Sequence, residues 1–205
     1  MRLRAHNAAR ASAAGVEVMT STIQPWKTLE STMAFDERWY QLRKDRVELP
    51  DGNVLDDYYV SVRADIAVVV AVSNEGTVPL VRQYKHGVQS ITLEFPAGAF
   101  SDEERPLRAA HRELMEETGW TSEAFDAIAV LFDDATKNTS RVHVFVATEA
   151  GRTATQRLDG TEQSAGLEVV EVQLGDLKGL LDTGEIAAQS SVAAGYRALS
   201  WLEAR

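Results

Sequence analysis

The sequence predicts an α/β sandwich built on a mixed sheet, with a small antiparallel sheet of its own at the N-terminus. Residues 39–62 form two alternating stretches around a turn, and residues 66–72 read IAVVVAV, like a strand buried on both faces. Residues 106–118 carry helix signals between strands. The length of 205 residues fits one domain with a small appendage. The expected division is a tail at 1–25, an N-terminal sheet at 26–62 and a main domain at 63–205.

The N-terminal region contains one clear hairpin. The first 18 residues are alanine-rich and carry three arginines but only one acid. They fit a disordered tail or a non-native extension upstream of Met19, and loosely resemble an organelle transit peptide. From Thr28 to Phe35 the pattern is weak. Between Trp39 and Val62, the turn Pro50-Asp51-Gly52-Asn53 separates two alternating stretches, which predicts a β-hairpin.

The main domain mixes strands with helices. The first strands are predicted at 66–72, 78–84 and 91–95. Pro96-Ala97-Gly98 then breaks the pattern. A helix follows over 106–118, because proline suits its first turn and Gly119 suits the left-handed residue that ends it, with Trp120 as the next apolar contact. The later elements are strands at 127–132, 142–148 and 167–174, and helices at 176–183 and 187–203.

Charge and composition exclude several classes of function. The formal net charge of −10 repels nucleic-acid backbones, and no run of lysine and arginine offsets it. We therefore expect no nucleic-acid partner, and a phosphate ligand needs positive charge from another source. No stretch is long and apolar enough to span a membrane. The chain has no cysteine, which excludes disulfides and permits a reducing compartment, so we expect a cytoplasmic protein.

Three glutamates, Glu113, Glu116 and Glu117, crowd into the last turn of the predicted 106–118 helix. A helix C-terminus is partly negative, and like charges three or four residues apart cost about 0.2–0.5 kcal/mol per pair. A solvated acidic face is the ordinary interpretation, but broken local rules are typical of functional sites. Clustered carboxylates are suitable ligands for Mg²⁺ or Mn²⁺. The expected buried face is a different one, formed by Leu107, Ala110 and Leu114.

The glutamates belong to a longer pattern, because residues 98–120 read GAFSDEERPLRAAHRELMEETGW. The fixed positions are Gly98, Glu104, Arg112-Glu113-Leu114, Glu116-Glu117 and Gly119, followed by a hydrophobic residue. This segment resembles the signature box of the Nudix hydrolases, with Trp120 where an aliphatic residue is usual. The resemblance implies that family's α/β/α sandwich. It also implies hydrolysis of a nucleoside diphosphate linked to another group, with a metal ion between the acidic protein and the anionic substrate.

The resemblance also implies a role for each matching residue. The expected metal ligands are Glu113, Glu117, the additional ligand Glu116, the accessory acid Glu104, and a backbone carbonyl at Ala97 or Gly98. Arg112 matches the arginine that orients the glutamates through ion pairs, and it is counted with Glu116 among the catalytic residues. Gly98 lets the loop approach the metal closely. The implied cofactor is Mg²⁺, with Mn²⁺ as an alternative.

Residues 81–100 and the 39–62 hairpin resemble ADP-ribose and nucleotide-sugar pyrophosphatases. Arg82-Gln83-Tyr84 and Leu93-Glu94-Phe95-Pro96-Ala97-Gly98 carry that likeness. The expected substrate contacts are Arg82, Glu94, Gly98 and Arg141. Lys85 and His86 add positive charge beside Arg82, although an ordinary solvated loop explains them equally well. Members of this subfamily usually form dimers that exchange their N-terminal sheets, so we expect a homodimer.

The subfamily often carries its catalytic base on a late loop, which here spans residues 152–166. Its only glutamate, Glu162, is the candidate base, and a mobile loop suits a base that moves in with the substrate. Glu168 is the alternative, and an ordinary solvated acid is the competing interpretation. Arg141 and His143 share one face of a strand beside the pocket, although a lone histidine there is more often structural.

The expected activity is metal-dependent hydrolysis of ADP-ribose or a related nucleoside diphosphate sugar, giving a nucleoside monophosphate and a sugar phosphate. ADP-ribose-specific members tend to carry a proline after the box, but residues 132–139, FDDATKNT, have none. GDP-mannose and UDP-glucose therefore stay open as substrates. The alternatives are a house-cleaning nucleoside triphosphate pyrophosphatase, against which the N-terminal sheet argues, and a non-catalytic nucleotide-sugar sensor, against which the complete box glutamates argue.

Overall fold

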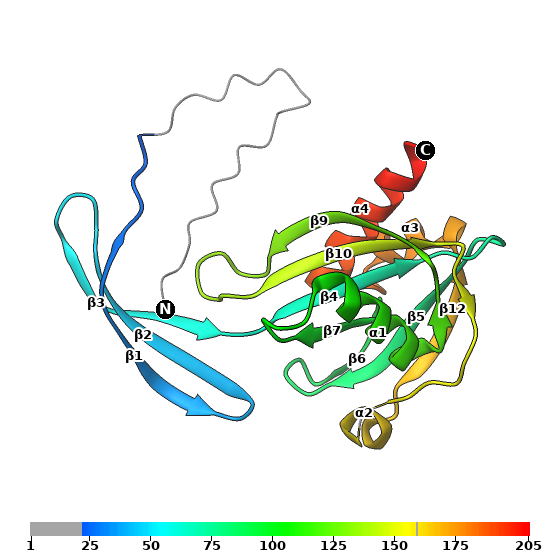
Figure 1. The fold of residues 1–205 in the computed structure, drawn as a ribbon, viewed down its shortest axis with the longest axis horizontal. Coiled ribbons are helices and arrows are strands. Elements are labelled where there is room, and N and C mark those ends of the chain that lie inside the picture. Colours follow the sequence, from blue (N-terminus) through cyan, green and yellow to red (C-terminus); the bar gives the residue numbers. More distant parts are fainter. Residues whose placement is uncertain (1–21, 159) are drawn as a thin grey trace.

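The structure is a computed structural model that describes residues 22–158 and 160–205 (Figure 1). It combines a mixed sheet, covering helices and a separate antiparallel sheet at the N-terminal end, so the predicted fold class is confirmed. The tail expected at 1–25 falls outside the described residues except for 22–25. Within the described part of the chain, no helix is both long and apolar enough to cross a membrane.

The N-terminal sheet has three antiparallel strands in the order β1-β2-β3. They are β1 (Lys27–Glu37), β2 (Tyr40–Glu48) and β3 (Val54–Val62). The predicted hairpin is confirmed as β2 and β3, and Gly52 turns the chain with a φ of 87° while its amide donates to the Leu49 carbonyl at 2.9 Å. The sequence does not predict β1, because nearly all of its side chains are exposed and no apolar alternation marks a buried face.

The N-terminal sheet is fixed to the loop that precedes β10 (Arg141–Thr148). Ser61 of β3 forms a parallel bridge with Asn138, and its amide donates to the Lys137 carbonyl at 2.7 Å. The Tyr58 hydroxyl donates to the Thr136 carbonyl at 2.6 Å. These bonds give the loop at 133–140 a partner that its own sequence does not reveal.

Two larger sheets form the main part of the molecule (Figure 1). The first has the order β7-β4-β10-β9 and contains β7 (Ala97–Phe100), β4 (Asp65–Ala71), β10 and β9 (Ala124–Phe132). Its β4 and β10 are parallel and its other pairs antiparallel, so the sheet is mixed. The second has the order β12-β5-β6 and contains β12 (Glu168–Gln173), β5 (Thr77–Lys85) and β6 (Ser90–Glu94). A two-stranded pair joins β11 (Gly151–Arg152) to β8 (Trp120–Thr121).

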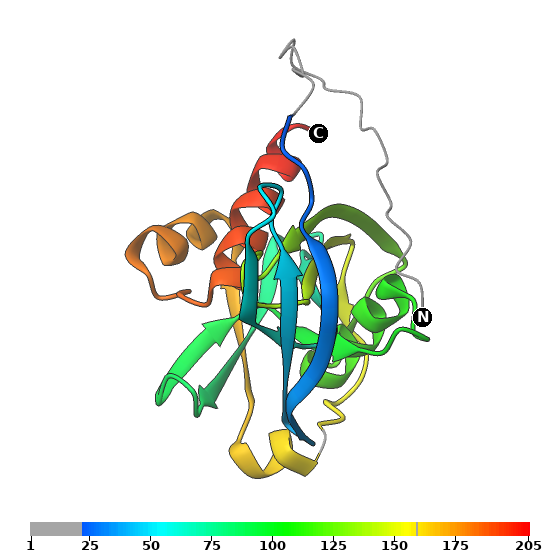
Figure 2. The ribbon, with the colours of Figure 1, turned by 90° about the vertical axis from the view of Figure 1, so that its left-hand side faces the viewer.

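Helices cover both faces of the four-stranded sheet (Figure 2). One face carries α1 (Pro106–Thr118) and the other carries α4 (Gln189–Glu203), while α3 (Leu174–Thr183) packs beside α4 and β12. Along β4, Val68 and Val70 pack in the core beneath α3 and α4, whereas Ala67 and Val69 pack in the core beneath α1. Both faces of β4 are thus buried, which explains why its sequence is continuously apolar.

The predicted strands and helices of the main domain are present, but the sequence does not predict β7, the two-residue strands β8 and β11, or α2 (Gly160–Ala165). Proline has no N–H to donate, so Pro96 ends the pairing of β6 with β5. The Pro96 carbonyl accepts the Val69 amide at 3.0 Å, and the chain continues at once as β7 beside β4. The stretch at 152–166 is also not one continuous loop, because α2 interrupts it.

Candidate active site

The helix that carries the acidic turn begins and ends where the sequence predicts. Pro106 occupies its first turn. Gly119 ends it in the left-handed conformation, with a φ of 74°, and donates its amide to the Met115 carbonyl at 2.8 Å. Trp120 then enters the core beneath α1. These ends fix which residues of the last turn face the sheet.

The buried side of α1 differs from the predicted one. Ala110 and Leu114 are buried as expected, but Leu107 is 39% exposed, so that part of the prediction is wrong. Leu107 lies in the first turn and borders an open hollow, which it lines with Arg105, Arg108, His111 and Glu123. Two acids lie on the sheet-facing side instead, Glu113 with 6% exposure and Glu117 with 2%.

The backbone of β7 makes room for these buried carboxylates. A Cβ at Gly98 would lie 1.9 Å from Oε1 of Glu113 and 2.5 Å from its Oε2, so a larger residue would displace the carboxylate. One residue earlier, the Ala97 amide donates to Oε2 of Glu117 at 2.9 Å. The start of β7 therefore positions Glu113 and Glu117 together. The expected approach of Gly98 to a metal, and the Ala97 carbonyl as a ligand, stay predictions.

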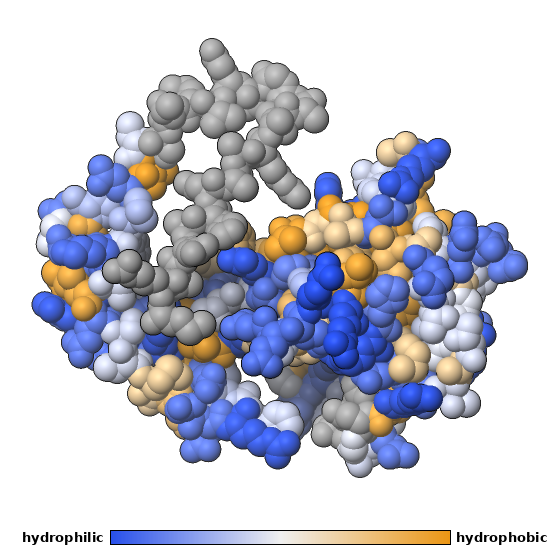
Figure 3. Space-filling model, in the orientation of Figure 1, coloured by the Kyte–Doolittle hydropathy of each residue, from blue (hydrophilic) through white to orange (hydrophobic). Residues whose placement is uncertain are grey.

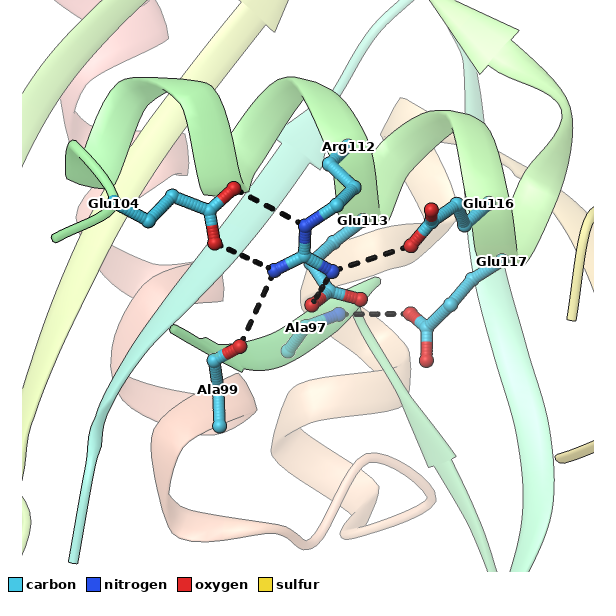
Figure 4. A network of polar contacts seen from close by, with 7 residues as sticks. All are labelled: Ala97, Ala99, Glu104, Arg112, Glu113, Glu116 and Glu117. Atoms are coloured by element: carbon cyan, nitrogen blue, oxygen red, sulfur yellow. Dashed lines mark hydrogen bonds and ion pairs between the residues drawn. The ribbon is translucent and has the colours of Figure 1, made fainter. Parts of the chain in front are cut away.

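Arg112 connects the acids around the last turn (Figure 4). Its Nε and Nη2 donate to the two oxygens of Glu104 at 3.2 and 3.1 Å. Its Nη1 donates to Glu113 at 2.6 Å and to Glu116 at 3.2 Å, and Nη2 also donates to the Ala99 carbonyl at 3.2 Å. A planar guanidinium suits this arrangement because its donors point in fixed directions. Arg112 thus contacts Glu104, Glu113 and Glu116 together, and its role in orienting them stays a prediction.

The charge of Arg112 offsets the repulsion among the glutamates. Its hydrogen bond holds the pKa of the Glu104 carboxyl below the ordinary value. In return, the hydrogen bond with Glu104 and the nearby charge of Glu113 raise the pKa of Arg112 above its ordinary value. Arg112 is therefore permanently charged, and it stabilises the ionised form of Glu104.

The donor atoms around the turn fit a hard divalent cation. Carboxylate oxygens are the ligands such ions prefer, and the missing side chain of Gly98 lets the Glu113 carboxylate lie against β7. Among the residues that the structure describes, no three His, Cys, Asp or Glu side chains are gathered closely enough to hold a metal ion, and Arg112 stands between Glu104, Glu113 and Glu116. The metal-ligand roles of the glutamates therefore stay predictions.

A cavity of about 760 Å³ lies between the β5–β6 hairpin and the chain that joins α3 to α4. It is lined by Arg63, Lys85, Thr92 and Glu94, among others. The Thr92 hydroxyl donates to Glu94 at 2.6 Å, and Lys85 Nζ lies 3.9 Å from the same carboxylate. Glu94 ends β6 three residues before Ala97 begins β7, so the chain leads from this cavity to the strand that contacts the acidic turn. Sequence analysis missed Arg63, since a lone arginine between two strands gives no local signal.

The structure does not bring the other expected substrate contacts to this cavity. Arg82 on β5 lies 3.8 Å from Glu168 of β12, its partner in register. Arg141 is exposed at the start of β10. On the same strand, Nε2 of His143 lies 3.0 Å from Oδ2 of Asp65, which gives this histidine the structural partner that the alternative interpretation expects. Substrate contact by Arg82 and Arg141 stays a prediction.

The candidate bases lie on the segment between β10 and β12. Glu162 lies in α2, and its side chain is outside the described part of the structure. Glu168 begins β12 and is exposed, with Arg82 as its ion-pair partner. The identity of the base stays a prediction.

Two family models match the chain. The model described as "Nucleoside diphosphate sugar hydrolase N-terminal domain" matches residues 26–61. The model described as "NUDIX domain" matches residues 63–192, which include α1 and both larger sheets. The two matches together cover the N-terminal sheet and the region that contains the acidic turn.

Curated proteins and solved structures show the same likeness. The chain is 31% identical over 160 residues to the ADP-ribose pyrophosphatase of Bacillus subtilis (strain 168), covering 78% of this chain and 85% of that protein. It is 33% identical over 159 residues to the ADP-sugar pyrophosphatase of Mus musculus, covering 77% and 72%. A structure titled "Crystal structure of ADP compounds hydrolase" has a TM-score of 0.77 at 21% identity, covers 90% of this chain and 98% of its own, and shows the fold alone.

Proposed function

The chain belongs to the Nudix family, and on this premise we propose that it hydrolyses the diphosphate bond of ADP-ribose or of a related nucleoside diphosphate sugar. The products are a nucleoside monophosphate and a sugar phosphate. The names of two relatives, an ADP-ribose pyrophosphatase and an ADP-sugar pyrophosphatase, support this substrate class, and both match more than two thirds of the chain. The match of residues 26–61 to the N-terminal domain of nucleoside diphosphate sugar hydrolases supports it further.

The observation that carries the proposal is the burial of Glu113 and Glu117 where α1 packs on β7. A buried carboxylate is costly, and apolar side chains in its place commonly stabilise a fold more. Packing alone therefore does not explain two acids here. Nudix hydrolases generally need a divalent metal ion, and a metal site accounts for both. The cofactor that we propose is Mg²⁺, with Mn²⁺ as a substitute, because both prefer carboxylate oxygens.

The residues of the acidic turn then have complementary tasks. A bound divalent ion polarises phosphoryl oxygens and makes a bound water easier to deprotonate. The proposed ligands are Glu113, Glu116, Glu117, the accessory acid Glu104 and the Ala97 carbonyl. Arg112 holds three of the carboxylates in place through its hydrogen bonds. Without that support the ligands would repel one another, so the arrangement depends on Arg112.

The cavity lined by Arg63, Lys85 and Glu94 suits the rest of the substrate. Its volume of about 760 Å³ lies inside the range of about 300–1,000 Å³ typical of ligand pockets. Arg63 and Lys85 offer positive charge to a diphosphate, which the net charge of −10 otherwise repels. Glu94 offers acceptors for sugar hydroxyls. Arg82 and Arg141 stay proposed contacts that would have to move to reach the cavity.

We assign the role of catalytic base to Glu162, which would take the proton from the attacking water. Support comes from its place on α2, in a segment whose preceding residues lie against the end of α1. Glu168 stays the alternative, although its ion pair with Arg82 gives it another function.

The working form that we propose is a homodimer, formed through the N-terminal sheet. Large apolar side chains are exposed on this sheet: Met33, Phe35, Trp39, Tyr40, Leu55 and Tyr59. Figure 3 shows apolar surface on this sheet beside charged surface. Exposed apolar patches of this kind commonly mark an interface. A second copy would cover them.

Analysis of the reaction products tests the proposed substrate class. Purified protein with Mg²⁺ is offered ADP-ribose, GDP-mannose, UDP-glucose and a nucleoside triphosphate, and the products are separated by chromatography. We expect AMP and ribose phosphate from ADP-ribose, or the equivalent pair from another nucleotide sugar. Release of inorganic diphosphate from the triphosphate alone would contradict the proposal in favour of a house-cleaning activity.

A further inference from the structure

The C-terminal end of α1 is covered by residues 153–157, which follow β11. The amides of Thr153 and Ala154 both donate to the Gly119 carbonyl, at 3.0 and 3.1 Å. The amide of Arg157 donates to the Glu116 carbonyl at 2.8 Å. The segment thus crosses the last turn of α1 and bonds to it at both ends.

The side chain of Gln156 completes this contact. Its Nε2 donates to the Glu117 carbonyl at 2.6 Å from a partly buried position. The chain can pass so close because Gly119 has no side chain. A Cβ there would lie 2.2 Å from the Ala154 carbonyl oxygen, and the φ of 74° adds a second reason for glycine. Gln156 is therefore the one side chain of residues 153–157 that bonds directly to a carbonyl of the acidic turn.

These donors satisfy backbone carbonyls at the end of α1. The last carbonyls of a helix lack intrahelical partners and are partly negative, and basic side chains often satisfy them. The last turn of α1 has no basic residue and carries Glu116 and Glu117 instead. The partners come from residues 153–157, which lie far away in sequence, so the turn's own sequence does not show how its carbonyls are satisfied.

We propose that Gln156 is a positioning residue that fixes the segment leading to α2 against the metal-binding turn. The inference rests on the proposed function, because it gives Gln156 its effect on turnover through the proposed base Glu162 and the proposed ligands Glu116 and Glu117. The carbonyls that accept from this segment belong to these two ligands themselves. Loss of the Gln156 bond leaves the three backbone bonds in place but loosens the base-bearing segment, without removing any ligand.

The chemistry of the bond predicts which substitutions are tolerated. Gln156→Glu keeps the size of the side chain, but it replaces the amide donor with a carboxylate that the carbonyl and Glu117 repel. Gln156→Lys keeps a donor and adds the positive charge that a helix C-terminus favours. A side chain that only fills space would respond similarly to both changes. Gln173→Glu is a matched control, because Gln173 is exposed at the end of β12, just before α3, and its amide lies 3.5 Å from the Thr77 hydroxyl.

The experiment compares steady-state hydrolysis of ADP-ribose by the wild type and these three variants of the full chain. We expect Gln156→Glu to lower kcat about tenfold or more with KM within about threefold, because small misplacement of a catalytic group has effects of this size. Its Tm should fall by no more than about 4 °C, as for the loss of one hydrogen bond. Gln156→Lys and Gln173→Glu should stay close to the wild type.

A second readout, amide hydrogen exchange of peptides covering 153–157, needs no substrate. Gln156→Glu should exchange faster there, whereas Gln156→Lys and Gln173→Glu should not. Unchanged exchange and unchanged kcat in Gln156→Glu, or equal losses in Gln156→Lys, would overturn the inference while leaving the proposed function intact. A wild type that hydrolyses no nucleotide sugar would instead contradict the proposed function, and the exchange comparison would still decide whether Gln156 fixes the segment.

Discussion

Arg112 and Gly98 decide how the acidic turn is arranged. Arg112 supplies donors to Glu104, Glu113 and Glu116, so charges that would repel one another are held around a single cation. Gly98 supplies space, because its missing side chain leaves the position that the Glu113 carboxylate occupies. The first effect is electrostatic and the second steric, and each leads to its own test.

Gly98→Ala should displace the carboxylate of Glu113, since the new Cβ would lie 1.9 Å from its Oε1. We expect a loss of about 1–3 kcal/mol in the free energy of unfolding from overpacking, together with a larger fall in turnover. Urea denaturation and steady-state kinetics measure the two effects. As a control, Gly179→Ala in α3, where a Cβ meets no atom within 4 Å, should raise stability by about 0.5–1 kcal/mol. Unchanged activity in Gly98→Ala would contradict the steric role.

The Glu104 carboxyl should make stability depend on pH in one direction. The hydrogen bond from Arg112 holds its folded pKa below the unfolded one. Its stabilising contribution is therefore present above the unfolded pKa and is lost as pH falls through the folded pKa. Urea denaturation of the wild type and of Glu104→Gln at a series of acidic pH values measures this. The difference between their free energies of unfolding should shrink as the pH is lowered. The exposed neighbour Glu103 provides the control Glu103→Gln. If this difference in free energy of unfolding does not change with pH, the hydrogen bond from Arg112 does not favour the ionised form of Glu104.

At the scale of elements, α1 shows what sequence can and cannot fix. Its ends were predictable because Pro106 and Gly119 act locally, and its acids were predictable because their spacing is distinctive. Its buried side was only partly predictable. Helical periodicity places Leu107 on the same face as Leu114, but in the structure Leu107 is exposed and Leu114 is buried. The same limit applies to β7, because only the tertiary fold offers the chain a place beside β4 after Pro96.

The rest of the site shows the same distinction. Arg63 joins Lys85 and Glu94 at one cavity only through the fold, and so no local pattern could select it. Likewise, nothing near Gln156 in sequence indicates that its amide meets the end of α1. The sequence predicted site residues that lie close together in one motif, such as the glutamates of α1. It did not predict Arg63 or Gln156, because their partners lie on distant strands or segments.

Substitutions at two leucines of α1 test the observed packing of this helix. Leu114→Ala should cost about 2–5 kcal/mol of stability, because Leu114 is fully buried between α1 and the sheet. Leu107→Ala should cost about 0.5 kcal/mol or less, because Leu107 is exposed. Urea denaturation of the two variants gives the comparison. Equal losses would mean that the first turn is covered after all, as periodicity alone predicts.

At the scale of the whole molecule, the N-terminal sheet has too little cover for its apolar surface. In the described part of the chain, this sheet of three strands has no helix packed on it, and Phe35 and Trp39 are exposed, with 79% of Trp39 accessible to solvent. The sheet is nevertheless held to the main domain through Ser61 and the loop before β10. Arg63 follows β3 directly and lines the cavity of about 760 Å³. A second copy packed on the N-terminal sheet would therefore lie in a fixed position relative to that cavity.

Phe35→Glu should weaken the proposed homodimer by placing a charge in its interface. Sedimentation velocity at several protein concentrations should show a dimer for the wild type and a shift toward monomer for the variant. Val130→Glu on β9 is the control, since Val130 is also exposed but lies outside the N-terminal sheet. A monomeric wild type, or equal weakening by both variants, would contradict the proposed interface.

We propose that the buried acids of α1 bind a divalent metal ion that the reaction needs. Glu117→Gln tests it most directly, because the new amide oxygen can still accept the Ala97 amide while the negative charge is lost. Measured with Mg²⁺ on ADP-ribose, kcat/KM should fall by more than about a hundredfold, beyond the loss caused by removing a group that merely supports a metal ligand. The Tm should stay near that of the wild type, and Glu103→Gln should be fully active. If Glu117→Gln hydrolyses ADP-ribose as fast as the wild type, the acidic turn does not hold the catalytic metal.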